Sequence, residues 1–168
     1  MTHILTAKEH TVFSLSAAHA IAATVASGSV VTFETGDEAY ERLSRGETLE
    51  QIGIENVNAV TGPLAIEGAQ PGDTLKIEIL SVEITRSWSV RMPGFGPLGE
   101  RITQQAVKQL PIDLDHGVVR ISDRLSVPLR PMIGCIATAP EHGVVASTCH
   151  PVHSGPQRLR ASERASQR

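Results

Sequence analysis

The stretch Thr61-Gly-Pro-Leu-Ala-Ile-Glu-Gly-Ala-Gln-Pro-Gly-Asp-Thr-Leu-Lys-Ile-Glu-Ile-Leu80 decides the fold class of this chain. It contains two turn signals, Thr61-Gly62-Pro63 and Pro71-Gly72-Asp73, because proline presets φ and glycine accepts a positive φ. A short apolar run, Leu64–Ile66, lies between the two turns. Closely spaced turns around short apolar segments are typical of a β-rich fold.

The residues after the second turn alternate between apolar and charged side chains. Leu75, Ile77 and Ile79 are separated by Lys76 and Glu78. A period of two residues is that of a strand with one buried face. The pattern therefore predicts a strand over Thr74–Ile84.

Composition places the chain among globular proteins. Its 168 residues suffice for one domain with a sizeable core, and 40% of them are hydrophobic. Aromatic residues make up only 3%, so the core must be built from aliphatic side chains. A net charge of −3 gives no reason to expect nucleic acid or an anionic membrane as a partner.

Cysteine usage and hydropathy point to the cytoplasm. Two cysteines, Cys135 and Cys149, are too few for a disulfide framework and form no CxxC motif. No apolar run is long enough for a membrane span, and no basic segment followed by an apolar one marks a secretory signal. We therefore expect a cytoplasmic protein.

The remaining segments predict short strands and few helices. A capping box, with Thr48 as N-cap and Gln51 three residues on, predicts a helical turn in Thr48–Ile54. Helix propensity favours a helix in part of Ala17–Val25, although the following segment is strand-like. The other predicted elements are a surface helix at Glu38–Arg45, strands at Val30–Glu34 and Gly117–Ile121, and an edge or interrupted strand followed by a buried one in Leu125–Ala137. The pattern as a whole predicts a mainly β fold, an antiparallel β-sandwich or barrel with one or two short helices.

Three motifs carry a resemblance to a known family. Asn58-x-x-Thr-Gly-Pro-x-x-Ile-Glu-Gly-Ala-x-Pro-Gly-Asp73 resembles the signature of the acetamidase/formamidase family. Pro93-Gly-Phe-Gly-Pro97 and Val127-Pro-Leu-Arg-Pro-Met-Ile-Gly-x-Ile136 are also similar to family segments, and the resemblance covers roughly Val30–Ser147. It implies a hydrolase acting on carbon–nitrogen bonds other than peptide bonds, which converts a small linear amide to a carboxylate and ammonia.

Carboxylates are the main catalytic candidates. Asp37 and Glu34 lie at the end of a predicted strand, although Asp37 by itself is better explained as the N-cap of the following helix. Val31-Thr-Phe-Glu-Thr-x-Asp37 resembles the family segment near a metal-dependent active site, which favours a functional Asp37. Glu67 lies between an apolar residue and glycines, where partial desolvation would raise its pKa and suit it to proton transfer. Alternatively, Glu67 hydrogen-bonds its own turn.

A metal and a substrate contact complete the predicted site. His150 and His153, next to Cys149, are candidate ligands beside Asp37 for a divalent ion, zinc or calcium. Such an ion would polarise the amide carbonyl and activate water. Without the resemblance, the two histidines are better explained as exposed polar residues, as are the other histidines of the chain, which are His3, His10, His19, His116 and His142. Phe95 closes over a small-molecule pocket or anchors an ordinary surface loop.

The resemblance ends near Ser147. Family members are longer and continue into a His-Gly-Gly-Asn-x-Asp segment that has no counterpart here. We expect a β-rich domain over residues 1–151, incomplete relative to the family fold, and a disordered tail over residues 152–168, whose arginine and serine content cannot build a core. One hypothesis is that the tail is translated out of frame after a change near codon 152, and a genuine short relative is the competing explanation.

An incomplete fold has two consequences. Missing partner strands would expose sheet edges, so we expect a homo-oligomer with little or no activity of its own. The rival prediction is a non-catalytic β-sandwich module for binding or assembly, in which Asp37 and Glu67 are only turn residues.

Overall fold

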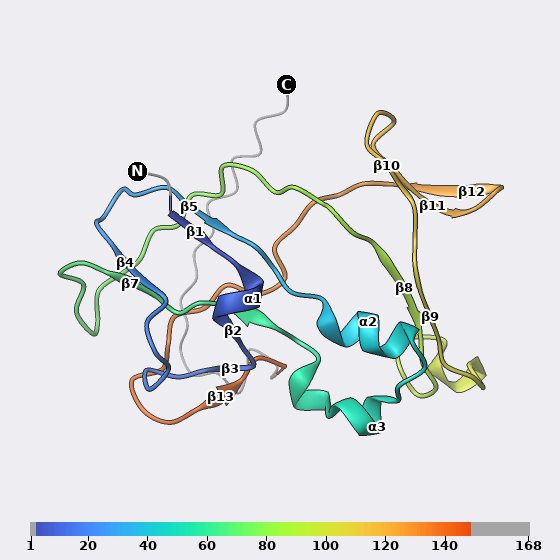
Figure 1. The fold of residues 1–168 in the computed structure, drawn as a ribbon, viewed down its shortest axis with the longest axis horizontal. Coiled ribbons are helices and arrows are strands. Elements are labelled where there is room, and N and C mark those ends of the chain that lie inside the picture. Colours follow the sequence, from blue (N-terminus) through green and yellow to red (C-terminus); the bar gives the residue numbers. More distant parts are fainter. Residues whose placement is uncertain (1–2, 149–168) are drawn as a thin grey trace. The chain divides into compact units, whose positions relative to one another are not determined.

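The computed structural model describes residues 3–148, and residues 1–2 and 149–168 lie outside the described part (Figure 1). The chain folds into two compact units. The first unit comprises residues 3–38, 53–80 and 135–148, and the second comprises residues 39–52 and 81–134. None of the described helices has the length and apolarity needed to cross a membrane.

Four two-stranded ladders build the first unit in the part of the chain that the structure describes. They are β1 (His3–Leu5) with β5 (Val31–Phe33), β4 (Ala23–Val25) with β7 (Leu64–Ile66), β2 (Thr11–Val12) with β6 (Val60–Thr61), and β3 (Ser14–Leu15) with β13 (Val145–Ala146). The first two ladders are parallel and the other two are antiparallel. The mainly β prediction is confirmed, but parallel pairing departs from the expected antiparallel arrangement. The two strands of each parallel pair are joined by a long connection rather than a hairpin, and parallel pairing requires such a connection.

The second unit combines two sheets with short helices. Its elements are α2 (Glu38–Ser44, whose first residue still belongs to the first unit), α3 (Leu49–Ile52), β8 (Trp88–Arg91), the 3₁₀ helix η2 (Gly99–Arg101), β9 (Ala106–Gln109), β10 (Ile112–Asp113), β11 (Val118–Ser122) and β12 (Leu125–Pro128). The β8–β9 and β10–β11–β12 sheets are antiparallel throughout. None of the sheets in residues 3–148 closes into a barrel.

The predicted helices of the second unit are confirmed. Helix α2 buries Ala39 and Leu43, four residues apart on one face. Helix α3 begins with the predicted capping box: Thr48 N donates to Gln51 Oε1 at 2.8 Å, and Gln51 N donates to Thr48 Oγ1 at 3.2 Å. Two backbone donors at the helix start are thereby satisfied by side chains close in sequence.

The helix suggested by propensity in Ala17–Val25 is wrong. Residues 17–22 form a turn and Ala23–Val25 form β4, which pairs with β7. Tertiary pairing therefore overrides local propensity there. Two short helices of the first unit were not predicted, α1 (Ala7–His10) and the 3₁₀ helix η1 (Ile54–Asn56).

The described apolar core is small and unevenly distributed. Its buried residues are Leu5 and Val25 in the first unit and Ala39, Leu43, Ile52, Leu110 and Val119 in the second. Leu5 is only 1% exposed. Much of the order of the first unit therefore rests on hydrogen bonds that link distant segments.

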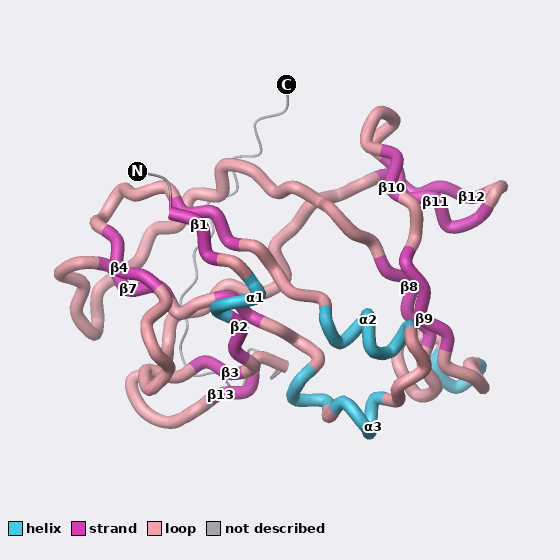
Figure 2. The backbone as a smooth tube through the Cα atoms, viewed as in Figure 1, coloured by secondary structure: helices cyan, strands magenta, loops and turns pink. Residues whose placement is uncertain are grey.

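The predicted strand over Thr74–Ile84 is not formed. These residues pair with no described strand, and Figure 2 draws them as loop. Leu75, Ile77 and Ile79 are 46%, 38% and 48% exposed. An alternating pattern becomes a strand only when another segment accepts and donates the ladder hydrogen bonds.

The second half of the Leu125–Ala137 prediction is also wrong. Strand β12 ends at Pro128, and Met132 and Ile133 beyond it are 75% and 40% exposed rather than buried. Pro128 and Pro131 lack the backbone N–H that donates hydrogen bonds to a neighbouring strand, so this segment can serve only as the edge strand of a sheet.

Candidate functional site

The family-like motif that starts at Asn58 joins several distant segments of the first unit. Strand β6 pairs with β2, and Gly62 N donates to His10 O at 3.0 Å. Beyond the cis Gly62–Pro63 peptide, Ala22 N donates to Pro63 O at 2.9 Å and β7 pairs with β4. The motif therefore lies between two ladders and belongs to both.

Asn58 and Ser147 fasten the start of this motif to β13. Asn58 Nδ2 donates to Ser147 O at 2.6 Å and to Cys135 Sγ at 3.3 Å. Ser147 Oγ lies 2.5 Å from Asn58 O and 2.9 Å from Phe13 O, and its single proton is donated to one carbonyl at a time. Ser147 is 8% exposed, so these bonds are largely shielded from water.

Glu34 and Asp37 lie in a segment that runs beside the same motif. Glu34 N extends the β1–β5 ladder by donating to Leu5 O at 2.9 Å. Thr61 Oγ1 donates to Glu34 O at 2.5 Å, so a side chain of β6 holds the backbone of this segment. Asp37 is half-buried and directly precedes α2, at the position that an N-cap residue occupies. The Glu34 side chain is exposed.

Glu67 follows the other end of the motif. Its N–H donates to Val25 O at 2.9 Å and continues the β4–β7 ladder. The Glu67 side chain is exposed. The expectation that turn glycines and Ile66 would partly desolvate this carboxylate is therefore wrong, because small glycines leave the side chain open to water.

Phe95 belongs to the second unit. It lies in the loop between β8 and η2, where Phe95 N donates to Met92 O at 3.2 Å and Gly94 N donates to Gly99 O at 3.1 Å. The loop is irregular, as its glycine and proline content predicted. Phe95 is 50% exposed.

Open cavities occur in the second unit and are lined by other residues. One of about 600 Å³ has apolar walls from Ile84, Leu110 and Ile112, and one of about 260 Å³ carries Arg91 and Arg101. Neither cavity is lined by any of the predicted site residues.

The metal prediction falls largely outside the described residues. His150 and His153 are in the part that the structure does not describe. Within residues 3–148, no three histidine, cysteine, aspartate or glutamate side chains are grouped to hold an ion. The described residues therefore provide no complete metal site of their own.

Three histidines are less exposed than the sequence predicted. His3, His10 and His19 are half-buried, and His19 Nε2 lies 2.8 Å from Ser14 Oγ and 3.1 Å from Ser14 O. Nothing in the alanine-rich segment around His19 signals this contact, because it depends on the turn that precedes β4.

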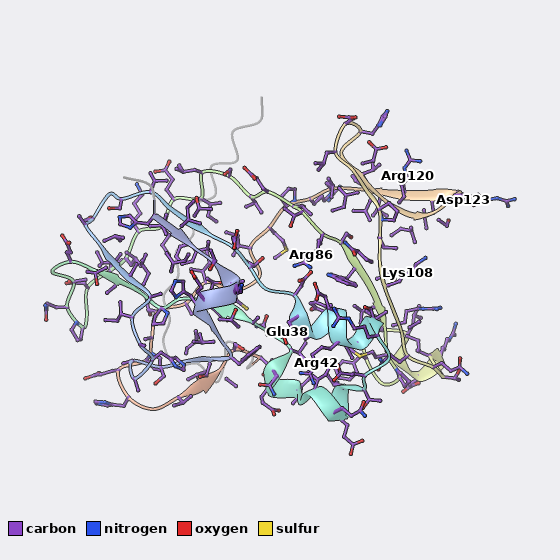
Figure 3. All side chains as sticks on the ribbon, viewed as in Figure 1. Glu38, Arg42, Arg86, Lys108, Arg120 and Asp123 are labelled. Carbon is purple, nitrogen blue, oxygen red and sulfur yellow. The ribbon has the colours of Figure 1, made fainter. Side chains whose placement is uncertain are left out.

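The clearest electrostatic perturbations belong to the second unit. Hydrogen bonds from Arg120, 2.7 Å away, and from His116 hold the pKa of the Asp113 carboxyl well below its usual range. Arg42, which Figure 3 labels, lowers the pKa of Glu47 through a bidentate hydrogen bond whose shorter arm is 2.7 Å. Both pairs lie at the surface and hold turns together, so we assign them structural roles.

Comparison with known proteins supports the resemblance seen in the motifs. The Acetamidase/Formamidase family matches residues 17–163. The chain belongs to this family. No curated protein gave a match.

Solved family structures superimpose on most of the chain. The acetamidase from Bacillus halodurans has a TM-score of 0.75 and 36% identity, and covers 85% of this chain. A predicted acetamidase/formamidase from Thermoanaerobacter tengcongensis has the same TM-score, 32% identity and 87% coverage. The acetamidase from Yersinia enterocolitica, at 20% identity and a TM-score of 0.65, shares the fold. This chain spans about half of each of these proteins, 48% of their length.

Proposed function

We propose that the chain forms part of a cytoplasmic hydrolase that converts small linear amides to a carboxylate and ammonia. The family match over residues 17–163 carries the proposal, together with the two solved relatives described as acetamidases or formamidases. The motif beginning at Asn58 adds support, because the side chain of its Thr61 holds the backbone of the segment that contains Glu34 and Asp37.

The proposed roles are those that the sequence suggested for each side chain. Hydrolysis requires water to add to the amide carbonyl, the C–N bond to break, and a proton to reach the departing nitrogen. In the proposal Glu67, exposed just after β7, carries that proton from the attacking water, while Asp37 binds the metal or lies next to it and Glu34 is a further candidate carboxylate. Phe95 contacts the substrate. The proposal includes a zinc or calcium ion, for which Asp37, His150 and His153 are the candidate ligands. Only Asp37 lies in the part of the chain that the structure describes.

Activity of this chain alone should be low, because it spans about half of its relatives. A homo-oligomeric state is part of the proposal. We expect ammonia release from acetamide or formamide above the rate without protein, but below the 1–10³ s⁻¹ typical of enzymes.

The test compares three carboxylate variants in that ammonia assay. Asp37→Asn and Glu67→Gln should each abolish release, and Glu83→Gln is the matched control because Glu83, like Glu67, is exposed. Equal loss in all three variants would contradict the assignment. Metal analysis gives an independent measurement: stoichiometric zinc or calcium should be lost in Asp37→Ala.

A non-catalytic binding or assembly module is the second candidate. The exposure of Glu67 favours it, and none of the candidate carboxylates lines either of the two described cavities. A folded, metal-free chain that releases no ammonia would support this candidate over the first.

A further inference from the structure

The segment Thr74–Leu80 has the sequence of a strand and lacks a strand partner among the described residues. Its apolar side chains alternate with charged ones, and Leu80 at its end is 67% exposed. Three alternating aliphatic side chains at 38–48% exposure form an apolar stripe open to water. Unpaired edges with an apolar face favour pairing with another chain.

The start of the segment is well defined. Asp73 N donates to Gln70 O at 3.0 Å, and Gln70 N donates to Asp73 Oδ2 at 2.8 Å, which closes a turn with Gly72 at φ 96°. Strand β7, just before this turn, is paired with β4. The segment therefore leaves a structured ladder and turn in the first unit, while its own backbone groups lack ladder partners among residues 3–148.

We propose that Thr74–Leu80 pairs antiparallel with the same segment of a second copy, with Ile77 on the two-fold axis. In this register Lys76 of each chain lies opposite Glu78 of the other, and Leu75 lies opposite Ile79. Opposite charges and aliphatic residues directly across an antiparallel pair are both stabilising. The pattern around Ile77 is thus self-complementary in charge and in apolarity, as an isologous interface requires.

The charge pattern favours a second copy in antiparallel orientation over other partners. With Lys76 and Glu78 on the polar face, the segment has no net charge that would attract a strongly acidic or basic peptide. A parallel self-pairing in register would place Lys76 against Lys76 and Glu78 against Glu78, which is repulsive. Two-stranded ladders are marginal by themselves, so the dimer should be weak and concentration-dependent. The proposal does not depend on amidase activity.

A charge exchange tests the pairing. Lys76→Glu and Glu78→Lys each place like charges opposite one another twice per dimer, and each should weaken self-association about tenfold. An equimolar mixture of the two variants should regain the original affinity, because the heterodimer restores both opposite-charge pairs. Sedimentation equilibrium measures the affinities, and circular dichroism checks that the exposed substitutions leave the fold intact.

Cysteine crosslinking tests the register. In a Cys135→Ser, Cys149→Ser background, Ile77→Cys should form a disulfide-linked dimer, because the two residues 77 face each other with Cβ atoms about 5 Å apart. Ile79→Cys is the matched control, since its two copies would lie about 14 Å apart along the strands.

Three results would overturn the proposal. They are a chain that stays monomeric at high concentration, a dimer whose affinity ignores the charge exchange, and equal crosslinking of the two cysteine variants. Slow amide hydrogen exchange of residues 74–80 in a monomer would also reject it, since that would reveal a partner within the same chain.

Discussion

The family-like motif around Asn58–Glu67 and the segment Thr74–Leu80 are close in sequence and opposite in structure. The first was predicted to be rich in turns around a short apolar run, and the second to be a strand. The first exchanges hydrogen bonds with β2, β4 and the end of β13, whereas the second pairs with no described strand. Residues of the first stretch are mostly half-buried and those of the second are exposed. The two stretches differ because only the first meets hydrogen-bonding partners from distant parts of the described chain, and their sequence patterns do not account for the difference.

The largest effect should come from removing a buried side chain of the first unit. Leu5, in β1, is 1% exposed, so Leu5→Ala should lower the free energy of unfolding by about 2–5 kcal/mol. Leu80→Ala is the same substitution at a 67% exposed residue and should cost less than about 0.5 kcal/mol. Urea unfolding of both variants measures the difference. Similar costs would show that Leu80 is covered in solution.

A smaller effect should follow from the Ser147 hydroxyl, which fastens Asn58 to β13. Ser147→Ala removes the donor to the Asn58 and Phe13 carbonyls, and should cost about 1–3 kcal/mol because both acceptors are shielded. Thr74→Ala, in the unpaired segment, removes an exposed hydroxyl and should be nearly neutral. The same urea titration measures both, and a neutral Ser147→Ala would mean that water replaces the hydroxyl.

The capping box of α3 isolates a purely local contribution. Thr48→Ala should cost about 1 kcal/mol, because one backbone donor loses its acceptor. Gln51→Ala removes the reciprocal bond, and the double variant should cost less than the sum of the two. Additive costs in thermal unfolding would show that the two bonds act independently.

The smallest effect on stability is expected at the surface pair of Asp113 and Arg120. The folded pKa of Asp113 lies below its unfolded value, so the pair stabilises the folded state above about pH 4. That contribution is lost as the pH falls through the folded pKa. Arg120→Met should raise the pKa of Asp113 toward 3.8, measured by carboxyl NMR. Arg124→Met, in the neighbouring turn, should leave it unchanged.

Local signals in the sequence were interpreted correctly where neighbours in the chain complete the structure. The capping box at Thr48, the Pro71-Gly72-Asp73 turn and the amphipathic helix after Asp37 each form as predicted. Each depends on contacts within a few residues, which the sequence displays directly.

Predictions that needed a distant partner were less successful. The Thr74–Ile84 strand lacks one among the described residues, and the propensity of Ala17–Val25 for helix was overridden by pairing with β7. For the candidate site, the sequence identified the family motif, and the roles of the acidic residues stay predictions. It could not show that Thr61 holds the Glu34 backbone or that Glu67 stays exposed.

The sequence by itself determined the family, the β-rich class and the two short helices α2 and α3, because motif and periodicity are properties of adjacent residues. Only the tertiary structure decided which extended segments became strands and which carboxylates were shielded from water. Hydrogen-bond pairing and burial both require atoms from elsewhere in the chain, so they are fixed by what each segment meets in space.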